Sequence, residues 1–276
     1  MRERAADAAY QGVPGAYSEE AARTLLGAGA TLLALPTLDT IFAAVVTGDA
    51  LHAVVPVENC LTGAVPNAYE LLFSHDLRAT AEARVRIDHV LAAPRGVRLD
   101  DITRVLSHPV ALAQCRQFFA AHPGIEPVAA FDTAGAVEMV VRAADGRSAA
   151  LASRRSADLY GAEIVAEHFQ DHAENWTRFL LVARGADEID TAAGRKALIT
   201  FGLPHAPGAL QKALGPLAEA GLNLTRIQSQ PVHGQPFEYR FIIEITAPPG
   251  LDLHEALTRL RDVTVELRVF GDYPFE

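Results

Sequence analysis

The pattern of apolar and polar positions divides the chain into two parts. Up to about residue 182, short apolar runs alternate with alanine-rich stretches of helical periodicity. The apolar runs predict strands at residues 53–57, 90–93, 104–106 and 149–152, and the stretches between them predict helices at 18–26, 110–121 and 134–144. This alternation is typical of an α/β fold with a mainly parallel sheet.

The pattern changes after residues 184–195, a polar, glycine-containing stretch that we interpret as a linker. Beyond it, strands are predicted at 196–203, 223–230, 238–245 and 263–270, and helices at 208–220 and 252–262. In the third of these strands Tyr239, Phe241, Ile243 and Ile245 fall on alternate positions, so we expect them to face inward. The order βαββαβ is that of a ferredoxin-like sandwich. We therefore predict a larger domain at 8–183 and a smaller one at 196–276.

Composition narrows the class of protein. The chain has 276 residues, half of them hydrophobic and 21% charged, which is ordinary for a globular protein with a core. A formal net charge of −10 argues against binding to nucleic acid or to an anionic membrane surface. Cys60 and Cys115 form no metal-type spacing and indicate a reducing compartment. We see no signal peptide, no transmembrane run, no nucleotide-binding loop and no metal motif, and expect a cytoplasmic protein without a cofactor.

Four polar segments follow a predicted strand or open a predicted helix, and we interpret all four as helix N-termini at one sheet edge. They are residues 11–20, 58–65, 107–109 and 132–135. Ser18 and Ser107 are suited to cap their helices, as is Asp132. A helix N-terminus carries about half a positive charge and unpaired N–H donors. Several of them at one sheet edge would bind a small dicarboxylate without a basic patch, which fits an acidic protein.

A further polar cluster lies directly before the apolar run at residues 179–182. Asn175, Thr177 and Arg178 are therefore predicted at the mouth of a buried strand, where side chains face a cleft. A threonine hydroxyl beside a guanidinium is a suitable pair for holding and protonating an oxyanionic substrate.

Taken in order, these segments make the chain resemble the prephenate dehydratase family over nearly its full length. The matching segments are the glycine-rich opening at 12–19, Glu-Asn-Cys-Leu-Thr-Gly at 58–63, Ser-His-Pro and the residues that follow at 107–115, Asp-Thr-Ala at 132–134, Tyr-Gly at 160–161, Phe-Gln-Asp at 169–171 and Asn-Trp-Thr-Arg-Phe at 175–179. The C-terminal unit, with Pro-Gly-Ala-Leu at 207–210 and Gly-Leu-Asn-Leu-Thr at 221–225, resembles the ACT regulatory domain that such enzymes carry.

The resemblance implies a two-lobed fold like that of periplasmic binding proteins, with the active site between the lobes. It implies conversion of prephenate to phenylpyruvate with loss of water and carbon dioxide, a step of phenylalanine biosynthesis. Thr177 would act at the departing ring hydroxyl, Arg178 would be the cation that orients a carboxylate, and Glu58 would assist. The substrate-binding residues that it implies are Asn59, Cys60, Gly63, Ser107, His108, Asp132, Thr133, Asn175 and Phe179.

Three positions depart from the family pattern. Cys60 and Asp132 stand where serine is usual, and Val110 stands where glutamine is usual. Asp132 is either a helix cap or a partner for a substrate ammonium group, such as that of arogenate. The alternatives are thus an arogenate dehydratase, a prephenate decarboxylase that does not aromatise the ring, and a non-catalytic protein that senses amino acids. Thr177 argues against the last two.

The regulatory domain of the family implies phenylalanine as an effector. The implied binding residues are Pro207, Gly208, Ala209, Leu210, Asn223, Leu224, Gln228, Ser229, Gln230 and Pro231. Gln-Ser-Gln-Pro at 228–231 replaces the Glu-Ser-Arg-Pro of the family, and we expect the loss of both charges to weaken effector binding. A sheet edge that pairs across a two-fold axis predicts a homodimer or homotetramer.

Overall fold

The computed structural model describes residues 5–168, 170–185, 195–232, 234, 238–251 and 253–275. It separates into two compact units, of which the first comprises Met1–Leu71 and Glu82–Leu181, and the second comprises Leu72–Ala81 and Val182–Glu276. Most of the linker predicted at 184–195 falls outside the described residues. None of the described helices is long and apolar enough to cross a membrane.

The first unit has two lobes, and the N-terminal lobe is built on a sheet with parallel pairs. Its elements are β1 (Ala6–Gln11), α1 (Tyr17–Leu26), β2 (Leu32–Leu35), α2 (Leu38–Thr47), β3 (Ala50–Asn59) and β4 (Gly63–Ala64). The first part of α3 (Ala68–Ser74), the last part of β5 (Arg78–Arg86) and the first part of β11 (Trp176–Ala183) also belong to it. Strand β1 pairs in parallel with both β2 and β3, and the order continues from β3 to β11 and β5. Buried apolar side chains of α2 such as Ile41 and Phe42 contribute to the core of this lobe.

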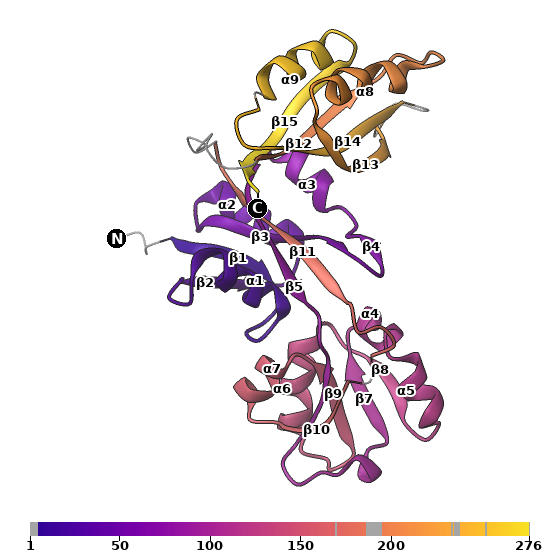
Figure 1. Ribbon diagram of the computed structural model, residues 1–276. Coiled ribbons are helices and arrows are strands. Elements are labelled where there is room, and N and C mark those ends of the chain that lie inside the picture. Colours follow the sequence, from indigo (N-terminus) through magenta and orange to yellow (C-terminus); the bar gives the residue numbers. More distant parts are fainter. Residues whose placement is uncertain are drawn as a thin grey trace. The chain divides into compact units, whose positions relative to one another are not determined.

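The second lobe contains a five-stranded sheet of order β10-β6-β9-β7-β8. Its elements are β6 (Val90–Ala93), the short 3₁₀ helix η1 (Leu99–Asp101), β7 (Arg104–Ser107), α4 (Pro109–Ala113), α5 (Arg116–Ala121), β8 (Glu126–Ala129), α6 (Thr133–Ala143), β9 (Ser148–Ala152), α7 (Arg154–Tyr160) and β10 (Glu163–Glu167). Helices α6 and α7 pack on one face of the sheet and α5 packs on the other (Figure 1). The sheet is mixed, because β6 pairs antiparallel with both β9 and β10.

Two chain crossings join the lobes of this unit, one after β5 and one before β11. They are tied to each other by a hydrogen bond from the Ile87 N–H to the Asn175 carbonyl, 2.7 Å long. A second set of contacts joins α7 to α1 and to the loop before it. Ser153 donates to the Gly15 carbonyl at 2.9 Å, and Arg155 reaches the buried Glu19 carboxylate at 2.8 Å. A side chain at Gly15 would lie 2.9 Å from Ser156 Cβ, so this close approach requires glycine.

Strands 90–93, 104–106 and 149–152 and helices 18–26 and 134–144 were all predicted within about two residues of their observed ends. Two local predictions are wrong. Residues 110–121 form two helices, α4 and α5, because the chain leaves helical geometry at Cys115 (φ −126°, ψ 36°). Residues 58–65 contain no helix start: β3 runs on to Asn59 and turns into β4, with which it pairs antiparallel.

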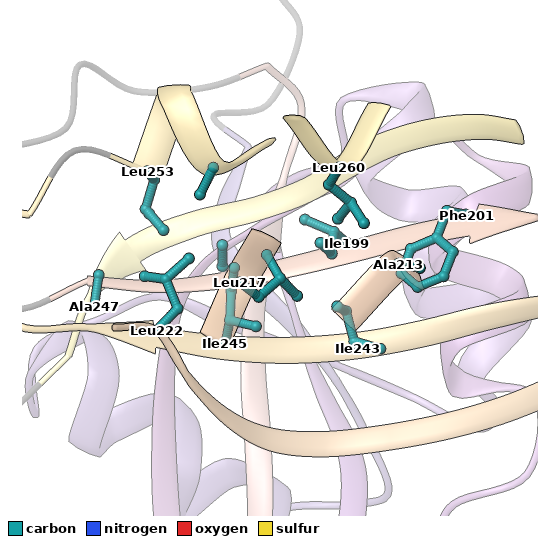
Figure 2. Close-up of a cluster of buried hydrophobic side chains, with 12 residues drawn as sticks. Ile199, Phe201, Ala213, Leu217, Leu222, Ile243, Ile245, Ala247, Leu253 and Leu260 are labelled. Carbon is teal, nitrogen blue, oxygen red and sulfur yellow. The ribbon is translucent and has the colours of Figure 1, made fainter. Parts of the chain in front are cut away.

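The C-terminal unit has the predicted order βαββαβ. Its elements are β12 (Arg195–Gly202), α8 (Ala209–Glu219), β13 (Asn223–Pro231), β14 (Tyr239–Ala247), α9 (Leu253–Arg261) and β15 (Val265–Pro274). The strands form an antiparallel sheet of order β13-β14-β12-β15. Side chains of β12 and β14, among them Phe201 and Ile243, meet Leu217 of α8 and Leu260 of α9 in one core (Figure 2). Tyr239 does not join it and is 47% exposed, because the strand begins at the sheet margin.

Residues 72–81 group with this unit through contacts with β15. Ala79 pairs with Gly271, and the rings of Phe73 and Phe270 lie 4.4 Å apart between centroids. Together the two units give the predicted fold class, an α/β domain with two lobes followed by a ferredoxin-like sandwich.

Candidate functional site

A cavity of about 810 Å³ lies in the first unit and is lined by residues of both lobes. Six residues predicted from the sequence line it, namely Asn59, His108, Asp132, Thr133, Thr177 and Phe179. Asp132 is the one carboxylate among the described lining residues, and none of those residues is lysine or arginine. A bound anion would therefore be held mainly by neutral donors.

Four helices begin at this cavity. Tyr17 of α1, Leu38 of α2, Val110 of α4 and Thr133 of α6 all line it and lie in the first turn of their helices. Three of these helices were anticipated from the sequence. The fourth is α2, capped by Thr37, and it takes the place of the helix wrongly predicted at 58–65. The N-terminal end of each helix dipole favours negative charge in the cavity despite the acidic sequence.

Thr177 lies near the start of β11, with its hydroxyl held by Asn59. Asn59 Nδ2 donates to Thr177 Oγ1 at 3.0 Å and to Asn175 Oδ1 at 2.7 Å. Asn59 Oδ1 accepts from the N–H groups of Leu61 and Thr62, at 3.0 and 3.1 Å. The side chain of Asn59 is thus satisfied by protein groups on both sides, which differs from the substrate contact predicted for it.

A buried histidine that the sequence did not point to continues this cluster. Asn175 Nδ2 donates to Gln114 Oε1 at 3.0 Å, and the same oxygen lies 3.3 Å from His89 Nε2. The other ring nitrogen of His89 lies 3.2 Å from the Tyr17 hydroxyl. His89 and Gln114 line the cavity, whereas Asn175 lies behind it. His89 stands in no motif, and packing alone brings it here.

The buried His89 makes stability depend on pH. Burial lowers the pKa of His89 from 6.5 to about 4, so the folded protein holds a neutral ring at pH 7. The unfolded chain binds a proton near pH 6.5, so stability is present above that pH and is lost as the pH falls toward 4. Between pH 7 and pH 5 we expect a loss of about 2 kcal/mol from this group. Urea denaturation at both pH values checks it, because the His89→Gln variant should lose about 2 kcal/mol less than the wild-type protein over this range.

Arg178 points to the opposite face of β11 from Thr177, because successive side chains of a strand alternate. Its guanidinium contacts Glu82 at 3.1 Å, Glu58 at 3.2 Å and the Tyr69 hydroxyl at 3.2 Å. Neither Arg178 nor Glu58 lines the cavity. Their positions thus differ from those expected of catalytic residues: Arg178 pairs with Glu82, which is nearly buried, and with Glu58, whose side chain is 41% exposed.

Three other predicted substrate-binding residues, Ser107, Cys60 and Gly63, do not line the cavity. Ser107 is fully buried and donates to the Leu151 carbonyl at 2.6 Å, so it is not the cap of α4. His108 is the cap, because its Nδ1 accepts from the Val110 N–H at 3.3 Å. The exposed thiol of Cys60 contacts backbone groups of residues 174 and 176, and Gly63 lies in β4 outside the lining.

Asp132 caps α6 through one carboxylate oxygen only. Its Oδ1 accepts from the Gly135 N–H at 2.5 Å. Its Oδ2 is buried and has no hydrogen-bond partner among the described residues. The predicted capping role is thus present, and the second carboxylate oxygen is buried without a hydrogen-bond partner among the described residues.

The C-terminal unit has a smaller cavity of about 460 Å³ between the end of β12, α8 and β14. Of the predicted effector residues, Pro207, Ala209 and Leu210 line it, and Gly208 is the N-cap of α8 with a left-handed φ of 77°. The remaining predicted residues lie along β13 and do not line it. The side chain of Gln228 there accepts from Arg226 at 2.8 Å. Among the described residues no group of three His, Cys, Asp or Glu side chains is placed to hold a metal ion.

Comparison with known proteins gives matches over nearly the whole chain. The family model described as prephenate dehydratase matches residues 8–187, and the ACT domain model matches residues 197–263. Arogenate dehydratase/prephenate dehydratase 2 of Arabidopsis thaliana is 39% identical over 97% of this chain and 72% of the relative.

Two of the similar solved structures match this chain over nearly its whole length. One is GqqA, described as a novel type of quorum quenching acylase, with a TM-score of 0.88 and 36% identity over 97% of each chain. The other is prephenate dehydratase from Arthrobacter aurescens in complex with L-Phe, with a TM-score of 0.85 and 31% identity over 97% of this chain and 90% of that one.

Proposed function

The chain belongs to the prephenate dehydratase family of lyases, and we propose that it removes water and carbon dioxide from prephenate or its amino-acid analogue arogenate in the 810 Å³ cavity. The observation that carries this proposal is the placement of Thr177 at that cavity, with its hydroxyl oxygen accepting from Asn59. A hydroxyl that accepts a hydrogen bond keeps its own hydrogen for another acceptor.

The reaction needs little chemical machinery. The ring C–O bond breaks, the electron pair of the bond to the ring carboxylate moves into the ring as carbon dioxide leaves, and the ring becomes aromatic. The departing hydroxyl takes a proton from Thr177 and leaves as water, and Thr177 regains a proton from solvent. A threonine is a weak acid in water, so hydrogen-bond donation from Asn59 and the four helix N-termini supply the polarisation that makes it effective.

The substrate's carboxylates would be held by neutral donors at the helix starts. Tyr17, Thr133 and Val110 mark three of these starts, and backbone N–H groups there favour anions. Phe179 and Phe131 provide apolar walls for the ring of the substrate. Phenylalanine is proposed as the effector of the C-terminal unit, where the 460 Å³ cavity is lined mainly by apolar side chains such as Leu210 and Phe241.

Arogenate is favoured over prephenate by the state of Asp132. Arogenate carries an ammonium group where prephenate carries a keto oxygen, and Asp132 is the one carboxylate among the described residues that line the cavity. Prephenate offers no cation to this carboxylate. An ion pair with the ammonium group of arogenate would therefore favour arogenate.

The test is to assay purified protein with prephenate and arogenate separately, identifying products by chromatography and mass. Phenylpyruvate or phenylalanine formed at enzymatic rates supports the proposal. A decarboxylated product that is not aromatic would replace it with the decarboxylase alternative.

The Asp132→Ser and Asp132→Asn variants test the substrate preference. Both keep a helix cap and remove the charge, so we expect the ratio of kcat/KM for arogenate to that for prephenate to fall about 10- to 100-fold. An unchanged ratio in both variants would mean that Asp132 only caps α6.

A further inference from the structure

Asn59, Asn175, Gln114 and His89 form a chain of hydrogen bonds behind the cavity. Which atoms donate and which accept along this chain follows from the contacts of Asn59. Two backbone N–H groups, of Leu61 and Thr62, meet the same oxygen of the Asn59 side chain. Because a backbone N–H can only donate, that atom must be Asn59 Oδ1, and the amide cannot turn over. Asn59 Nδ2 is thereby fixed as a donor, and the acceptors within its reach are Asn175 Oδ1, Thr177 Oγ1 and the Trp176 carbonyl.

The next groups follow by the same rule. Asn175 must offer Oδ1 to Asn59, which leaves its Nδ2 facing Gln114 at 3.0 Å. Gln114 must then offer Oε1, and His89 Nε2, which lies 3.3 Å from that oxygen, must carry a hydrogen. His89 is buried and its ring is neutral, so a hydrogen on Nε2 leaves Nδ1 as an acceptor toward the Tyr17 hydroxyl. The same hydroxyl donates to the Asp88 carbonyl at 2.8 Å, so its one hydrogen is shared between two acceptors.

We propose that Asn59 is a positioning residue that directs the Thr177 proton into the cavity, and that Asn175, Gln114 and His89 form a hydrogen-bond chain that supports the Asn59 amide in the orientation set by Leu61 and Thr62. Asn175 is fully buried, and its side chain contacts both Asn59 and Gln114. If Asn175 no longer presented an acceptor, Asn59 Nδ2 would lose its 2.7 Å partner, and its contact with Thr177 would be held less firmly. The expected effect on catalysis rests on the proposed function, whereas the order of donors and acceptors along the chain does not.

The decisive variant is Asn59→Asp, which keeps the size of the side chain and replaces the donor by an acceptor. The carboxylate still accepts from Leu61 and Thr62, so the turn keeps its bonds. Thr177 would then donate to the new carboxylate instead of to substrate. Because Asn175 would then face an acceptor, its side-chain amide would rotate to present Nδ2. The amide of Gln114 would rotate in turn, and the hydrogen of His89 would move from Nε2 to Nδ1.

Two measurements test this in the full-length protein. We expect kcat to fall about 100-fold, the lower end of what a general acid contributes, with KM changed less than about threefold. Nitrogen NMR of histidine-labelled protein, assigned with His89→Gln, should find the His89 proton on Nδ1 in the variant and on Nε2 in the wild-type protein. The matched control is Asn67→Asp, the same change at an exposed turn residue outside the cavity lining, which should alter neither readout.

Either of two results would overturn the proposal: a kcat within about threefold of wild type, or a His89 proton that stays on Nε2. If the wild-type protein turns over neither substrate, the proposed function fails. The tautomer measurement then still tests the order of donors and acceptors along the chain.

A second pair of variants serves if Asn59→Asp does not fold. Gln114→Glu keeps an acceptor between Asn175 and His89, whereas Gln114→Met removes it. We expect Gln114→Glu to retain about tenfold more kcat than Gln114→Met, because only the first preserves the chain. Equal kcat in the two variants would contradict the chain.

Discussion

Replacing Thr177 by valine should lower kcat by about 10² to 10⁴, the range that a positioned general acid contributes. Valine keeps the shape of threonine and removes its hydroxyl, so the cavity and the Phe179 wall next to it should persist. KM should change little, because the hydroxyl acts mainly on the departing group in the transition state. Steady-state kinetics with both substrates measures the effect.

Thr177→Ser is the matched control for that experiment. It restores a hydroxyl that accepts from Asn59 and donates into the cavity, so we expect it to recover most of the lost kcat. Wild-type kcat in Thr177→Val would show that another group supplies the proton. Ligand binding that is equal in wild type and variant, with no turnover in either, would instead favour the non-catalytic sensor considered from the sequence.

Replacing Arg178 by methionine should destabilise the protein by about 3–5 kcal/mol. Its side chain is 9% exposed and contacts Glu82, 8% exposed, at 3.1 Å, so removal leaves a buried carboxylate without this cation. The Glu58 carboxylate and the Tyr69 hydroxyl lose a donor as well. Urea denaturation at pH 7 gives the free energy of unfolding.

Arg178→Lys separates this structural role from catalysis. It keeps the positive charge with fewer donors, so we expect a smaller loss of stability and, in the folded protein, a smaller fall in kcat than in Thr177→Val. A lysine variant that unfolds like wild type yet loses turnover as strongly as Thr177→Val would restore the predicted role of Arg178 as the substrate's cation.

Thr177 and Arg178 show what a sequence motif can and cannot predict about a site. Thr177 and Arg178 were predicted to act together because they are adjacent in the sequence. Adjacent residues of a strand face opposite sides, so only one of them reaches the cavity, and the other joins Glu58 and Glu82 across the three central strands. The period of the strand was available from the sequence, but which face it turned to the cavity was not.

Other differences have the same origin in packing. Ser107 was predicted to cap a helix, but β7 includes this residue, and its hydroxyl donates to the Leu151 carbonyl of the neighbouring strand β9. The start of α2 at the cavity was not anticipated, because nothing in residues 37–38 indicates which sheet edge they reach. Asp132 was assigned two alternative roles, and its two carboxylate oxygens differ in the structure: one caps α6 and the other is unsatisfied.

The sequence by itself determined the α/β class, the ferredoxin-like C-terminal order, the family and the position of Thr177 at a strand mouth. The class and the C-terminal order depend on periodicity and on local residue preferences, which act within a few residues of each other, and the family was inferred from the resemblance of ordered motifs. Only the tertiary structure decided that Asn59, Asn175, Gln114 and His89 form one chain behind Thr177. Asn59 and Asn175 are separated by 116 positions and Asn175 and Gln114 by 61. Contacts over such separations arise when both lobes and their crossings pack together, and no local pattern encodes which polar side chains will then meet.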